Sequence, residues 1–88
     1  MIFILLAKFK KGLTREVIAE NLKDIEMDHA EGVKYLGIYW TLGKYDTVVM
    51  VEAPNEKVAM NMVLRRADRM EVEALVALPA SEKHPGGP

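Results

Sequence analysis

The chain has 88 residues, of which 12 are basic and 13 acidic, and it contains no cysteine. This length fits one domain and excludes two of ordinary size. The lack of cysteine excludes disulfides and thiolate metal sites. A net charge of -1 argues against a general nucleic-acid-binding protein, which needs a basic face. No segment approaches the roughly 20 apolar residues of a membrane span, so we expect a cytoplasmic protein with no membrane or nucleic-acid partner.

The first half of the chain is expected to form a strand, a helix and a second strand. Ile2–Phe9 is apolar at nearly every position, which is typical of a strand covered on both faces. Thr14 is a suitable N-cap for a helix that ends near residues 28–30, before Gly32. Val33–Leu42 is rich in β-branched and aromatic residues and indicates the second strand. The apolar stripe of the helix is spaced i, i+4 and i+7 and consists of Ile18, Leu22 and Ile25.

The second half repeats this order after a turn. Gly43 and Lys44 lie where a tight two-residue hairpin turn is expected, and Tyr45–Glu52 follows as the third strand. Asn55 is a good cap for a second helix, and Met70–Leu78 reads as the fourth strand. The stripe of the second helix comprises Ala59, Met62 and Val63.

The order βαββαβ predicts an α+β fold, the ferredoxin-like sandwich, with a four-stranded antiparallel sheet and two helices on one face. We expect a single domain over residues 1–79 and a flexible tail over residues 80–88. Residues 2–6 and 48–51 are apolar at both parities, so the second face of the sheet exposes more apolar surface than a monomer usually tolerates. A second copy of the chain is the simplest cover, which predicts at least a homodimer.

Residues 39–46 and 51–56 resemble the GYD-domain family, whose Gly-x-Tyr-Asp motif matches Gly43, Tyr45 and Asp46. The resemblance implies a dimeric α+β barrel, in which two ferredoxin-like sheets face each other. It does not imply an activity. Related dimeric barrels include small monooxygenases, muconolactone isomerase-like enzymes and the ligand-sensing domains of Lrp/AsnC-type regulators.

The motif and the aromatic residues before it supply the candidate ligand-binding residues, and each has a structural alternative. Asp46 could be a polar anchor or base with Tyr45 beside it. Alternatively, Gly43 supplies a positive φ, Asp46 bonds to turn amides, and Tyr45 packs across the hairpin. Tyr39 and Trp40 point to opposite faces and could form a pocket wall, a core contact or a dimer contact.

Other polar residues are expected to have no catalytic or metal-binding role. His29 suits a helix C-terminus as a cation, and no second histidine has ligand spacing, so no metal or cofactor is expected. Glu71 and Glu73, with Glu52 a possible neighbour, could be paired carboxylates, but a solvated edge is the commoner role. A basic cluster near the end of the second helix is interpreted as a solvated helix end and comprises Arg65, Arg66 and Arg69.

Three functions remain open on the sequence. The first is a homo-oligomeric, ligand-binding or regulatory module without chemistry of its own, which the sequence favours. The second is a small cofactorless enzyme, monooxygenase- or isomerase-like, that works in a cavity between helices and sheet. The third is a purely structural assembly unit. A cavity would separate the first two from the third.

Overall fold

The computed structural model describes residues 1–81, so most of the predicted flexible tail, residues 82–88, lies outside the described residues. Within the described part the elements follow the predicted order βαββαβ. They are β1 (Ile2–Phe9), α1 (Arg15–Ala30), β2 (Lys34–Trp40), β3 (Thr47–Glu52), α2 (Glu56–Arg66) and β4 (Met70–Ala77).

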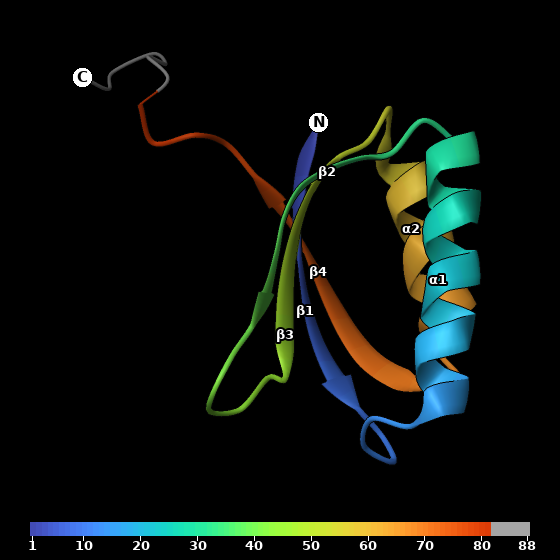
Figure 1. The fold of residues 1–88 in the computed structure, drawn as a ribbon. Coiled ribbons are helices and arrows are strands. Elements are labelled where there is room, and N and C mark those ends of the chain that lie inside the picture. Colours follow the sequence, from blue (N-terminus) through green and yellow to red (C-terminus); the bar gives the residue numbers. More distant parts are fainter. Residues whose placement is uncertain (82–88) are drawn as a thin grey trace.

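The four strands form one antiparallel sheet in the order β2-β3-β1-β4. Both helices cover the same face of it (Figure 1). The alternate residues of β1 that face the helices are buried. Phe3 and Leu5 pack with Val51 of β3 and Met62 of α2 in the main core, whereas Ala7 and Phe9 pack with Met70 in a second, smaller cluster. This confirms the predicted α+β fold of the single chain. The homodimer remains a prediction.

The local signals that start and stop the helices act as expected. The Thr14 hydroxyl oxygen accepts a hydrogen bond from the Val17 N–H at 3.1 Å, and the Asn55 amide oxygen accepts one from Val58 at 3.0 Å. Each bond satisfies a donor that the first turn of a helix leaves free. After α1, Gly32 takes a φ of +92°, a conformation that favours glycine.

The inner face of α1 differs from the prediction. Leu22 is 60% exposed and Ile18 is 45% exposed, whereas the buried residues of α1 are Asp24 and Asp28. Of the predicted apolar stripe, only Ile25 remains half-buried. The helix is therefore positioned by charged groups, since these are the side chains that it turns toward α2.

Asp28 is the centre of this contact and is fully buried. Its carboxylate accepts hydrogen bonds from Arg66 at 2.6 Å, from Arg65 at 2.8 Å and from the Tyr35 hydroxyl. We call these four residues the Asp28 cluster. It joins α1 to α2 through the two arginines, and to β2 through Tyr35. A buried carboxylate is tolerated only with such partners.

Two further contacts extend the charged interface along the helices. At one end Arg69 pairs with Asp24 and lies 3.6 Å from Glu20. At the other end Glu31 pairs with Arg65 and accepts a hydrogen bond from Asn61 at 2.9 Å. The interpretation of the three arginines as a solvated helix end is therefore wrong. They pack against a row of acids on α1 spaced about one turn apart.

We expect Asp28→Asn to lower the free energy of unfolding by about 3–5 kcal/mol, because it leaves the buried Arg66 guanidinium without an anionic partner and Arg65 with Glu31 alone. Chemical denaturation at pH 7 measures this loss. Glu26→Gln, an exposed acid on the same helix, is the matched control and is expected to change the stability by less than about 0.5 kcal/mol.

The stability difference between the wild type and Asp28→Asn is also expected to depend on pH. Burial raises the pKa of Asp28, but the hydrogen bonds from Arg66, Tyr35 and Arg65 lower it more, so it lies below its ordinary value. The unfolded chain then takes up this proton first as pH falls. The stability difference between the wild type and Asp28→Asn should be complete above about pH 5 and shrink as pH drops further. A difference that stays constant down to pH 2 contradicts this assignment.

Candidate functional site

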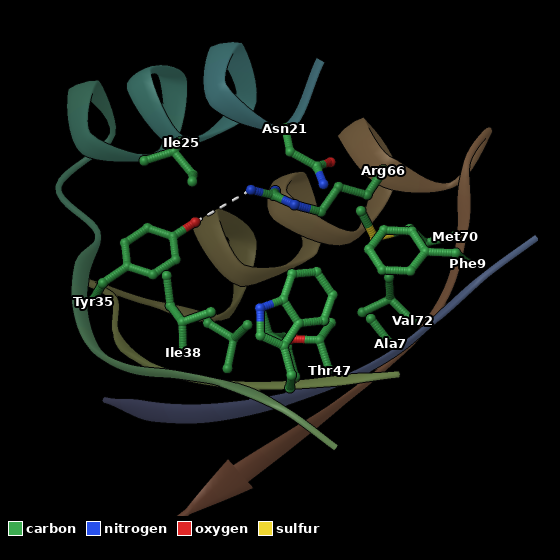
Figure 2. A pocket seen from close by; sticks show the side chains of 13 residues that line it. Ala7, Phe9, Asn21, Ile25, Tyr35, Ile38, Thr47, Arg66, Met70 and Val72 are labelled. Carbon is green, nitrogen blue, oxygen red and sulfur yellow. Dashed lines mark hydrogen bonds between the residues drawn. The ribbon is translucent and has the colours of Figure 1, made fainter. Parts of the chain in front are cut away.

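A cavity of about 140 Å³ lies between the sheet and the helices. Figure 2 shows its lining, which is mainly apolar. The floor is formed by helix-facing side chains of the strands, among them Ala7 and Val49, and the roof by Asn21 and Ile25 of α1. Arg66 closes the side next to α2. The cavity separates α1 from the sheet, while α1 itself packs on α2 through the Asp28 cluster.

A bulge in β2 places three large side chains on the cavity side. The pairing of β2 with β3 shifts between Tyr35 and Gly37, and such an extra residue reverses the facing of the residues that follow. Tyr35, Ile38 and Trp40 therefore all line the cavity. A Cβ at Gly37, beside the bulge, would lie 2.8 Å from the exposed Tyr39 ring, so a larger residue there would require this ring to shift.

The mouth of the cavity is apolar and exposed. Trp40 is 68% exposed although one side of its ring faces the cavity, and its ring centroid lies 6.2 Å from that of Phe9. Ile38 is also exposed. Ile18 and Leu22 lie seven and three residues before Ile25, which puts them on the same side of α1.

Few polar groups reach the cavity, and most already have partners. Arg66 donates to Asp28, to the Tyr35 hydroxyl at 3.2 Å (dashed in Figure 2) and to the Met62 carbonyl at 3.0 Å. Burial, followed by the hydrogen bond to Asp28, raises the pKa of Tyr35. The exception is Asn21, whose Oδ1 is buried and has no hydrogen-bond partner within residues 1–81.

The Gly-x-Tyr-Asp hairpin is longer than predicted and has a structural function. Six residues, 41–46, connect β2 and β3, so the predicted two-residue turn is wrong. Gly43 takes the predicted positive φ, at +113°. The Asp46 carboxylate accepts a hydrogen bond from the Phe9 N–H at 2.8 Å, and the Asp46 N–H donates to the Ala7 carbonyl at 2.9 Å. Asp46 thus joins the loop to the end of β1 instead of bonding to turn amides.

Tyr45 lies away from the cavity. Its hydroxyl donates to Glu73 of β4 at 2.7 Å, and the Lys44 ammonium lies 5.5 Å from its ring centroid. With Lys8 and Glu71 these residues surround a shallow second hollow. Tyr45 therefore does not pack across the hairpin. Glu52, the possible neighbour of the β4 glutamates, pairs with the opposite end of β1.

The five predicted ligand-binding residues are thus not brought together. Trp40 lines the cavity, whereas Tyr39 points to the opposite face of the sheet. The lining residues that the sequence did not indicate are Asn21, Tyr35 and Arg66. The sequence pattern that could have indicated them is weak. It consists of an asparagine on the inner side of the first helix, near acidic residues whose spacing suits ion pairs with the arginines at the end of the second helix.

His29 is exposed in the last turn of α1, with its ring 5.7 Å from that of Tyr35 in an edge-on arrangement. Residues 1–81 contain no group of three or more side chains that could hold a metal ion. Neither helix in the described part of the chain has the length and apolar character needed to cross a membrane.

We expect Gly43→Val to cost about 1–2 kcal/mol of stability, because a β-branched residue is strained at positive φ. Steric overlap does not enter, since no atom lies within 4 Å of a Cβ built there. Thermal or chemical unfolding measures the loss. Leu42→Val, at a fully exposed position in the same loop, should be close to neutral. Equal effects of the two variants would argue against the backbone explanation.

Substitutions of Asp46 test its bond to β1. Asp46→Asn keeps an oxygen acceptor for the Phe9 N–H and should be mild, whereas Asp46→Ala leaves this donor unpaired and should cost about 1–3 kcal/mol. Amide hydrogen exchange at Phe9 is the specific readout. Protection of that amide should survive in Asp46→Asn and fall in Asp46→Ala, and unchanged protection in both would refute the assignment.

Comparisons with known proteins agree with this fold. A search of curated proteins found no match. The crystal structure of Atu4242 from Agrobacterium tumefaciens is similar with a TM-score of 0.61 and 13% sequence identity, over 92% of this chain and 95% of that one. SCO4226 from Streptomyces coelicolor A3(2) is similar with a TM-score of 0.54 and 14% identity, over 88% of this chain and 98% of that one. The family model of the GYD domain matches residues 4–84, and the chain therefore belongs to the GYD domain family.

Proposed function

We propose that this protein is a homodimeric GYD-domain module that binds a small ligand in the cavity beneath α1. The observation that carries the proposal is the cavity itself, which is lined by apolar side chains from strands and helices and open at a mouth of exposed apolar residues. Concave, mainly apolar sites with a few directed polar groups are typical of small-molecule binding. A purely structural unit has no need of such a space, because filling it would add stability.

The cofactorless enzyme is the second candidate, and the cavity lining favours binding over catalysis. The described lining contains no carboxylate and no histidine. Tyr35, whose pKa is raised, is protonated at neutral pH and is a poor base. Asp46, the acid–base candidate from the motif, is hydrogen-bonded to the Phe9 amide. A general base must reach the proton that it abstracts, and neither residue meets this need.

The helix-free face of the sheet supports the homodimer. We call it the open face. Its central row runs across Leu75, Ile4 and Met50, which are paired by the strand register, and the next row adds Leu6 and Val48. Leu75 is 41% exposed. A contiguous apolar patch of this kind marks an interaction surface, and a two-fold dimer would bring the same patch of each copy together.

The ligand proposal is tested with a fragment library and two-dimensional ¹H–¹⁵N NMR. We expect binders whose shift changes cluster on cavity residues. Ala7→Leu, which would extend a buried side chain into the cavity, should weaken them at least tenfold. Ala19→Leu, at an exposed position on α1, is the size-matched control and should bind normally. Binders that are unaffected by Ala7→Leu, or a library without cavity binders, would overturn the ligand-binding function.

The assembly is tested by size exclusion with light scattering. The wild type is expected at twice the chain mass of 9.9 kDa at micromolar concentration. Ile4→Glu should shift it to the monomer, because it places a charge at the centre of the open face. Leu64→Glu, at an exposed apolar position of α2, should leave the dimer intact. A monomeric wild type contradicts the dimer.

A further inference from the structure

We propose that the cavity selects an uncharged, single-ring compound that carries one hydroxyl group, with the hydroxyl hydrogen-bonded to Asn21. This inference rests on the proposed ligand-binding function and names its ligand class. Three observations carry it: an unpartnered amide in the roof, a charge-balanced wall, and an aromatic and aliphatic lining of limited size.

Among the described lining residues, only Asn21 has a buried side-chain polar atom without a hydrogen-bond partner. Its side chain extends from α1 into the cavity (Figure 2), and its Oδ1 is buried without a partner within residues 1–81. A buried amide left unpaired destabilises the fold, and asparagine is also a poor residue for a helix interior. An apolar residue at this position would make the fold more stable. A residue that lowers stability in this way is typical of a functional site.

A hydroxyl group suits this amide in either orientation of its side chain. In an asparagine amide the oxygen accepts hydrogen bonds and the nitrogen donates them. A hydroxyl can do both, so it pairs with Oδ1 as a donor and with Nδ2 as an acceptor. A carboxylate can only accept, and an ammonium group can only donate.

The charges around the cavity argue against an ionic ligand. Arg66 is the one charged side chain of the lining, and its guanidinium already binds Asp28, the Tyr35 hydroxyl and the Met62 carbonyl. An anion would have to displace the Asp28 carboxylate from Arg66. A cation would find no acid among the described lining residues. Burying an unpaired charge in an apolar site is costly, so the wall selects an uncharged compound.

The size and walls of the cavity favour one ring. Its volume of about 140 Å³ is comparable to that of an apolar cavity that accepts benzene, about 150 Å³. Phe9 and Trp40 offer aromatic surfaces with a tilt of 36° between their planes, and rings pack favourably in such offset or edge-on arrangements. Ile25 and Val49 add aliphatic surface to the lining.

The test compares p-cresol, toluene and 4-methylbenzoate by calorimetry at pH 7, with ¹H–¹⁵N NMR to locate binding. These probes share a methyl-substituted ring and differ in the polar group. The wild type should bind p-cresol about five- to tenfold more tightly than toluene, the gain of one buried hydrogen bond, and should bind 4-methylbenzoate most weakly. Asn21→Leu should remain folded with equal or higher melting temperature and should lose the preference for p-cresol. Ala19→Leu is the control and should keep it.

The outcomes separate this inference from the proposed function. If p-cresol and toluene bind the wild type equally, or Asn21→Leu keeps the preference, the hydroxyl inference fails and the ligand cavity stands. Tightest binding by 4-methylbenzoate would overturn the inference in favour of an anion site at Arg66. If none of the probes perturbs cavity residues, the inference fails, and the fragment library then decides whether the ligand-binding function fails with it.

Discussion

The burial of one carboxylate, Asp28, is the constraint on which the rest of the structure depends. It is fully buried between two helices and a strand, so it must receive hydrogen bonds in the folded chain. Arg65 and Arg66 supply them from α2, and Tyr35 supplies one from β2. These bonds fix the distance between α1 and its neighbours. Apolar contact alone would draw the helix down onto the sheet.

The cavity follows from this arrangement. Because α1 is held by charged groups at its inner face, Ile18 and Leu22 stay exposed, and of α1 only Ile25 and Asn21 line the space above the sheet. The bulge in β2 then turns Trp40 toward the same space. The position of α1 and the bulge in β2 together leave a cavity between the helices and the sheet of this ferredoxin-like sandwich. In this chain the Gly-x-Tyr-Asp motif stabilises the loop beside the cavity, through the hydrogen bond from the Phe9 N–H to the Asp46 carboxylate.

Most of the fold, and little of the site, could be predicted from the sequence. Caps and breakers such as Thr14, Asn55 and Gly43 act on neighbouring residues, so their effect can be read locally. The strand pattern of β1 likewise carries its own periodicity. The function of Asp46 could not be read in this way, since its partner Phe9 lies 37 residues earlier. The acids of α1 were missed because charged residues on a helix are usually solvated. Only the match between their spacing and the arginines of α2 indicates burial.

The central claim is that the Asp28 cluster holds α1 away from the sheet and so keeps an apolar cavity open. A crystal structure of the protein under xenon pressure tests it most directly, because xenon occupies empty apolar cavities of this size. The account predicts a xenon atom enclosed by Ile25, Val49 and Trp40, with both arginines still bound to Asp28. A structure in which Trp40 and α1 close the space, without xenon between them, would contradict it.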